Sequence, residues 1–170
     1  MTEVILFAVS IICVAAVAIV AIALTLKHQK SFQQIEQQLV RNKITLPLRL
    51  QAYERCVVFL ERISPDSLVV RVNKGEDTVA SLQARLLSTI RTEFEHNISQ
   101  QLYVSPESWV YVVNAKNNIV GLVNSCSSKL HPDMRAIELS KLIIEAYANI
   151  ETSPTALAKQ KIKQEVALLY

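Results

Sequence analysis

The stretch LPLRLQAYERCVVFLERI, residues 46–63, decides the fold, because its apolar side chains recur with the period of an α-helix. One face of that helix is marked at i, i+3, i+7 and i+10 by Leu50, Tyr53, Val57 and Leu60. The charged residues of the stretch lie mainly on the opposite face. This pattern predicts an amphipathic helix that buries one side in a core.

The chain after residue 63 carries the start and stop signals of a series of helices. Caps, first-turn prolines and helical periodicity predict helices over 66–72, 79–102, 106–129, 132–150 and 154–169. A strand remains an alternative for LVVRV at 68–72 and WVYVV at 109–113, because both runs are rich in β-branched or aromatic residues. For the second run, the preceding Ser105-Pro106-Glu107 favours a helix start.

The helix predicted over 79–102 has clear signals before it. Asn73-Lys74-Gly75 is a stop signal for the preceding helix, and Asp77 or Thr78 can cap the new one. The side chains expected to face inward are Val79, Leu82, Leu86, Ile90, Phe94 and Ile98. Together these segments predict an all-α fold, with a small helical bundle in residues 44–170.

Composition argues against several function classes. Two glycines in 170 residues disfavour phosphate-binding loops and dinucleotide folds, which need close backbone approach. All 18 Lys and Arg lie after residue 26, as do 14 of the 15 Asp and Glu, so this part carries only +4. That mild excess suits a domain near anionic lipid and argues against a nucleic-acid partner. The three cysteines form no CxxC, which fits a reducing compartment.

The N-terminal residues 4–26, VILFAVSIICVAAVAIVAIALTL, carry no charge. At about 1.5 Å per residue this run is long enough to cross a hydrocarbon core of roughly 30 Å, so it predicts a transmembrane anchor. A cleaved signal peptide is the less favoured alternative, because the start MTE has no positive charge and the run exceeds a signal h-region. Glu3 precedes the run and Lys27 and Lys30 follow it, which predicts a single-pass protein of the bacterial inner membrane with a cytoplasmic C-terminal domain.

Residues 27–43 are expected to form a juxtamembrane stalk helix. Its apolar stripe at i, i+3 and i+7 consists of Phe32, Ile35 and Leu39. Packing of the stalk on its own domain is favoured because fewer than two heptads fit, and a short coiled-coil seam between copies is the alternative.

Two runs carry a resemblance: QAYERCVVFLERISPDSLVVRV at 51–72 and RTEFEHNISQQLYVSPESW at 91–109. From residue 46 onward, most of the chain resembles an uncharacterised family of short, single-pass membrane-anchored proteins of Bacteroidota. The resemblance implies lineage and topology. It supplies no reaction, ligand or partner.

The one pair with metal-like spacing is Glu93 and His96, at i and i+3 of a predicted helix. A ferritin-like dimetal site would need a second Glu-x-x-His, and neither His28 nor His131 has a glutamate three residues before it. Glu93 and His96 also lie at the flanks of the predicted inward face, not at its centre. A solvated helix face is therefore favoured; no metal site or cofactor is assigned, and Glu93 and His96 remain the only metal candidates.

The sequence also lacks a clear set of residues for nucleophilic catalysis. The sequence has no GxSxG, and a thiolate at Cys126 paired with His131 is the one conceivable arrangement. A small, buried apolar cysteine at a helix end is favoured instead. No catalytic residue is assigned.

Trp109 and Tyr111 are the candidates for a protein-interaction anchor, because both residue types are preferred at interfaces. Core packing is the favoured alternative, since a bundle with few phenylalanines needs large residues inside. The last predicted helix carries Lys159, Lys161 and Lys163 beside apolar positions. We expect this helix to dock on the bundle, and lying on the membrane surface is the less favoured alternative.

The sequence thus predicts a membrane-tethered helical interaction or scaffold module, an accessory subunit of an inner-membrane or envelope complex, and favours a non-enzymatic role. The expected partners are membrane lipid, through residues 4–26, and a protein or a second copy of the chain. One alternative is a membrane-anchored enzyme or metal-binding bundle that uses Glu93 and His96. Another is a lipid- or ligand-sensing bundle, which would need an apolar pocket.

Overall fold

The computed structural model describes residues 1, 19, 22, 24–27, 29, 36, 43–75 and 78–169. The chain divides into two compact units, Met1–Pro47 and Leu48–Tyr170. The predicted anchor 4–26 and stalk 27–43 lie largely outside the described residues, so both stay predictions. No helix in the described ranges combines the length and the apolar character that a membrane crossing needs.

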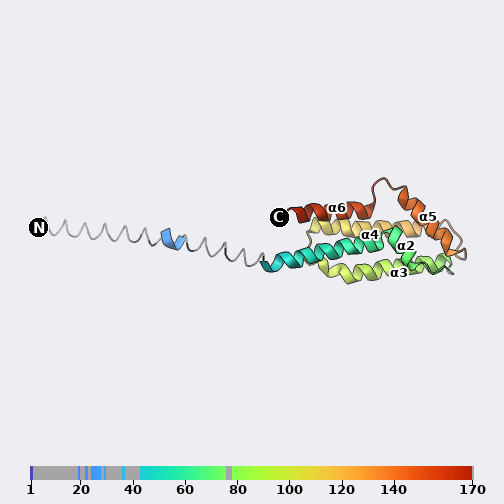
Figure 1. Ribbon diagram of the computed structural model, residues 1–170, viewed down its shortest axis with the longest axis horizontal. Coiled ribbons are helices and arrows are strands. Elements are labelled where there is room, and N and C mark those ends of the chain that lie inside the picture. The colour runs from blue at the N-terminus through green and yellow to red at the C-terminus, as the bar shows by residue number, and fades with distance from the viewer. Residues whose placement is uncertain are drawn as a thin grey trace. The chain divides into compact units, whose positions relative to one another are not determined.

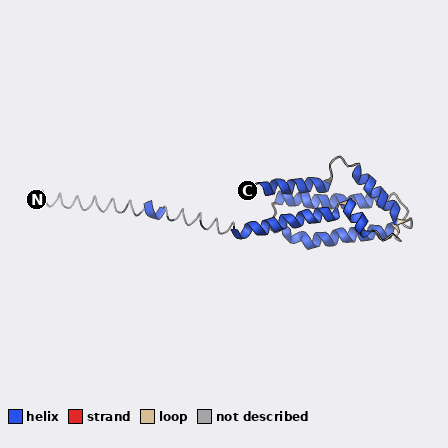
Figure 2. Ribbon diagram, viewed as in Figure 1, coloured by secondary structure: helices blue, strands red, loops and turns tan. Residues whose placement is uncertain are grey.

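The second unit, as far as it is described, consists of helices (Figures 1 and 2). Residues 48–63 are helical, part of a described helix that runs over 43–63, and we call this part the 48–63 helix. The later elements are α2 (Pro65–Val72), α3 (Val79–Asn97), the 3₁₀ helix η1 (Ile98–Leu102), α4 (Pro106–Ser127), α5 (Ala136–Ala148) and α6 (Pro154–Ala167). The all-α prediction is confirmed for these residues, and the runs 68–72 and 109–113 are both helical.

Three predicted helix starts are confirmed by their hydrogen bonds. The hydroxyl of Thr78 accepts from the Ser81 amide, that of Ser105 from the Ser108 amide and that of Ser153 from the Ala156 amide, at 3.2–3.3 Å. Such bonds satisfy amides that have no partner inside the first turn. The other candidate cap, Asp77, lies outside the described residues.

The predicted start of α5 at residue 132 is wrong, because the helix begins at Ala136. The carbonyls of Pro132 and Met134 accept bonds from the amides of Ala80 and Val79, at 3.0 and 2.8 Å. Backbone that pairs across to the start of α3 in this way is not available for a helical turn. Thr78 and Arg135 form an isolated antiparallel bridge at the same place.

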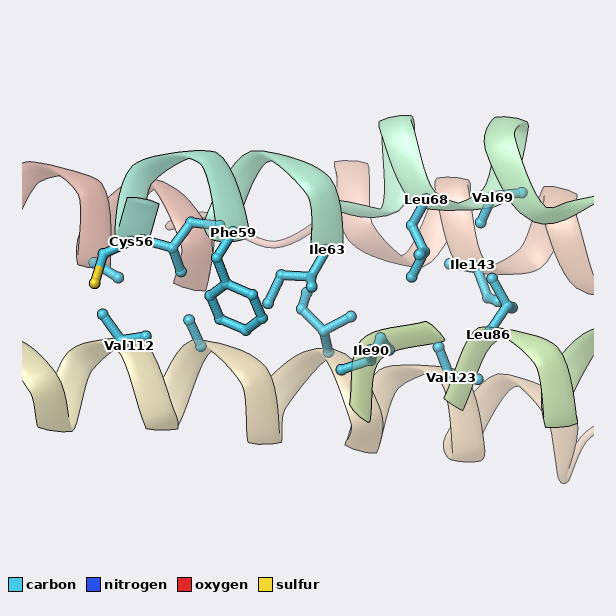
Figure 3. Packing of buried hydrophobic residues seen from close by; sticks show 14 of the residues in the cluster. Cys56, Phe59, Ile63, Leu68, Val69, Leu86, Ile90, Val112, Val123 and Ile143 are labelled. Carbon is cyan, nitrogen blue, oxygen red and sulfur yellow. The ribbon is translucent and has the colours of Figure 1, made fainter. Parts of the chain in front are cut away.

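The core is lined by the 48–63 helix and by α2, α3, α4, α5 and α6, whereas η1 has no buried residue. Figure 3 shows Cys56, Phe59 and Ile63 pointing from the 48–63 helix toward α4. The predicted stripe of that helix is therefore only one edge of its buried face: Tyr53 and Leu60 are buried, whereas Leu50 and Val57 are partly buried. A helix packed on more than one side buries a wider arc than a single stripe.

One inward assignment in the helix predicted over 79–102 is wrong. Val79, Leu82, Leu86 and Ile90 are buried and Phe94 is partly buried, but Ile98 is 45% exposed. Ile98 begins η1, where the helix tightens from 3.6 to about 3.0 residues per turn. Ile98 lines the same open groove as Ile90 and Phe94, so it keeps their face and is exposed because no neighbouring helix covers this end of it.

Candidate interaction site

An open groove of about 510 Å³ lies between α3 and α4. Its apolar lining consists of Leu87, Ile90, Phe94, Ile98 and Val120. The apolar side chains of α3 and η1 recur over eleven residues. One neighbouring helix does not cover the whole of this strip, and the uncovered part forms the groove. On the α4 side, polar residues flank Val120 one turn away in each direction, Lys116 before it and Asn124 after it.

An aromatic row fixes the floor of the groove. The ring of Phe94 stacks on Trp109, with centroids 5.8 Å apart and planes 28° apart. Phe94 also contacts Phe59, with ring centroids 5.9 Å apart and the two rings tilted relative to each other. The ammonium of Lys116 lies 4.6 Å from the centre of the Phe94 ring, close enough for a cation–π interaction. Phe94 is thereby held between core aromatics and a cation at the rim.

The two predicted interaction residues do not share one surface. Trp109 is partly buried and stacks on Phe94, a residue that lines the groove. Tyr111 is partly buried as well, but its ring lies 5.9 Å from the ammonium of Lys161 in α6. Residues two apart on a helix point roughly 200° apart, which explains the separate neighbours. Their role as partner contacts stays a prediction.

The carboxylate of Glu93 is engaged by arginines of two other helices. Glu93 Oε1 accepts a hydrogen bond from Arg62 Nε at 2.7 Å and lies 3.8 Å from Arg71 Nη2. The Glu93 side chain is only 15% exposed, whereas His96 is exposed. Among the described residues, no three His, Cys, Asp or Glu side chains gather where they could hold a metal ion. The arrangement of Glu93 is that of an interhelical ion pair.

Cys126 and His131 have different neighbours. The Cys126 thiol is buried and donates to the carbonyl of Leu142, with Sγ···O 3.7 Å. Burial raises the pKa of Cys126, and nearby Lys129 offsets this only in part. His131 is 71% exposed, and its Nδ1 lies 3.6 Å from a carboxylate oxygen of Asp133. A raised pKa disfavours the thiolate that nucleophilic chemistry would need.

A polar cluster that sequence reasoning missed gathers around Glu165 of α6. Its Oε1 accepts hydrogen bonds from the Tyr53 hydroxyl at 2.6 Å and the Ser105 amide at 3.0 Å, and lies 3.5 Å from Arg49 Nη2. Its Oε2 accepts from the Ser105 hydroxyl at 2.6 Å. One signal was available in the sequence. Glu165 lies three residues after Ile162 and one before Val166, on the apolar side of the last helix.

Electrostatics keep the Glu165 carboxylate charged. Burial by itself would raise the pKa of Glu165, but hydrogen bonds from Ser105 and Tyr53 outweigh it and lower that pKa. Burial and the hydrogen bond to Glu165 raise the pKa of Tyr53. A charged carboxylate beside a neutral phenol and the N-terminus of α4 is a stable structural arrangement, because the helix dipole favours an anion there.

Comparison with known proteins places the chain in a family. No curated protein and no solved structure matches it. A family model described as a family of unknown function, DUF7935, matches residues 1–169. This match confirms the predicted membership of an uncharacterised family, and it does not bear on lineage or on membrane anchoring. The chain belongs to DUF7935.

Proposed function

We propose that the protein is a membrane-tethered, non-enzymatic interaction module that binds a helix of a partner protein in the α3–α4 groove. The observation that carries this proposal is the groove itself, an open apolar channel with a fixed aromatic floor. Grooves of this kind receive the apolar face of an amphipathic helix. The protein would then serve as an accessory subunit of an inner-membrane or envelope complex.

The dimensions and charges of the groove suit such a ligand. Leu87 and Ile98 are eleven residues apart, so the apolar strip is roughly 16 Å long and matches about three turns of a helix. Arg91 and Lys116 stand at the rim with one acid, Glu95. A partner helix with apolar side chains at i, i+4 and i+7 and an acidic flank would complement this surface.

Site-specific photocrosslinking in cells tests the groove. A photoreactive phenylalanine analogue replaces Ile98, which lines the groove and is 45% exposed, or Val110, a matched control on α4 that is 54% exposed and outside the lining. We expect a discrete adduct from position 98 alone, and its reduction by Lys116→Glu. Equal adducts from both positions, or none from position 98, would refute the groove as the binding site. An adduct of twice the chain mass would identify the partner as a second copy.

The tether is supported by the uncharged run 4–26 and by Lys27 and Lys30 after it. Separate fusions of a cytoplasm-active fluorescent protein and a periplasm-active phosphatase to Tyr170 test the orientation. We expect fluorescence and no phosphatase activity. Phosphatase activity would overturn the cytoplasmic placement, and a protein that fractionates without membranes would overturn the tether while leaving the groove proposal intact.

A further inference from the structure

A second open pocket, of about 630 Å³, lies where α4 passes the start of α6 (Figure 1). On the α4 side its lining includes Gly121 and Ser125. On the other side it includes Ile150, which precedes α6, and Leu157, which belongs to α6. We call it the α4–α6 pocket. It shares Asn117 with the α3–α4 groove and otherwise has a different lining, so the two are separate surfaces of α4.

The described residues that line the α4–α6 pocket are uncharged, with amide, hydroxyl and apolar side chains. The exposed residues of α4 between 108 and 127 have the same character: a valine, four asparagines, a glycine and a serine. Asparagine and glycine are poor helix formers, so they weaken a helix whose outer face only meets water. This composition therefore points to a contact that the isolated chain does not make.

Gly121 provides space on the outer face of α4. It is exposed in the interior of the helix, where glycine costs about 1 kcal/mol relative to alanine. A Cβ added at Gly121 would meet no atom within 4 Å, so packing within the chain does not require a glycine there. A glycine at such a position permits the close approach of another backbone.

The chemistry of the α4–α6 pocket suits a second copy of this chain. An asparagine amide both donates and accepts hydrogen bonds, so it can pair with the same residue type across a two-fold axis. Leu157 lines the pocket with 42% of its surface exposed, and it is an apolar side chain that the pocket of another copy can receive. Two uncharged linings oppose no like charges. Two copies that met at the α3–α4 groove would bring together the cations Arg91 and Lys116 of both, which is unfavourable.

We propose that the α4–α6 pocket is the contact surface between two copies of this chain, related by a two-fold axis near Gly121. The two α4 helices approach each other at Gly121, and Leu157 of each copy enters the pocket of the other. Because this surface and the α3–α4 groove have different linings, the inference does not depend on the groove or on its ligand.

Sedimentation equilibrium of the full chain in density-matched detergent micelles tests the dimer. Gly121→Arg places two cations at the axis and should raise the dissociation constant of the dimer at least tenfold. The control Val110→Arg lies on the same helix, is 54% exposed and is outside the pocket lining, so it should leave the constant unchanged. A native protein that sediments as a monomer, or a dimer that is equally stable in Gly121→Arg, would overturn the proposal.

Photocrosslinking in cells gives a second test that does not use the arginine variant. A photoreactive phenylalanine analogue replaces Leu157, or the control Met134, which is 40% exposed and outside the pocket lining. We expect an adduct of twice the chain mass from position 157 alone. No adduct from position 157, an adduct of another mass, or equal adducts from both positions would show that a second copy does not occupy the pocket.

Discussion

The carboxylate of Glu165 lies 2.6 Å from the hydroxyl of Ser105, the residue that caps α4. This hydrogen bond joins the last helix to the first turn of another helix, 60 residues earlier in the chain. It places a negative charge at the positive end of the α4 dipole, where an acid stabilises a helix. The relationship has a direct consequence for the dependence of stability on pH.

Acid should weaken the protein in part through Glu165. Because the folded protein lowers the pKa of Glu165 below its ordinary 4.5, the charged carboxylate stabilises the fold above about pH 4.5. That contribution is lost as the pH falls through the lower, folded-state pKa. The difference in unfolding free energy between the native protein and Glu165→Gln should therefore be largest near neutrality and shrink toward pH 3. Denaturant titrations at pH 7, 5 and 3.5 measure it, and a difference that stays constant would contradict the assignment.

Truncation of core leucines should be costly. Leu60 and Leu86 are fully buried, so Leu60→Ala or Leu86→Ala should each cost about 2–5 kcal/mol through lost burial and a residual cavity. Arg55→Ala, at an exposed position of the same 48–63 helix, is the control and should change stability by about 0.5 kcal/mol or less. Circular dichroism during heating compares the three variants. If the leucine variants melt like Arg55→Ala, the described core is wrong.

Glu93 and His96 should respond differently to substitution. Glu93→Gln weakens an ion pair with Arg62 and Arg71 and should cost about 0.5–1 kcal/mol, while His96→Ala, at an exposed position, should be nearly neutral. Elemental analysis of the purified protein should find no stoichiometric Fe, Mn or Zn. Metal that is bound one to one and lost in both variants would revive the metal-binding alternative.

Gly75 should tolerate alanine poorly although nothing crowds it. Its φ of 82° lies in the left-handed region, and no atom lies within 4 Å of an added Cβ. Gly75→Ala should therefore cost about 1 kcal/mol through backbone strain alone, and Gly75→Asn less, because asparagine adopts this region more readily. Gly121→Ala is the control: it has equal space but lies inside α4, where alanine is the better helix former. That variant should be neutral or stabilising in the same thermal melts.

Local patterns predicted most of the described fold. The helix that contains Leu60, the caps at Ser105 and Ser153 and the burial of Leu86 all depend on neighbours within a turn or two. The exposure of Ile98 was missed because the pattern of one helix does not show where a neighbouring helix stops covering it. The late start of α5 was missed because it is set by tertiary hydrogen bonds from the start of α3 to the carbonyls of Pro132 and Met134.

The candidate sites were harder to predict. Glu165 meets Tyr53 across 112 residues of sequence, a distance at which periodicity carries no information. Trp109 was singled out as a candidate partner contact, with core packing the favoured alternative; it is partly buried, and its stacking on Phe94 depends on how α3 crosses α4. The groove forms only where those two helices pack against each other. A single helix pattern can indicate an apolar face without indicating which part of it a neighbour leaves open.

The aromatic row also provides a built-in optical reporter. Trp109 is the only tryptophan in the chain, and its indole stacks on the ring that forms the groove floor. Any helix that settles on Phe94 changes the polarity and packing around this one chromophore. Emission excited at the indole band should therefore shift or quench during titration with a groove ligand, so the affinity of a candidate peptide becomes readable from the unlabelled protein.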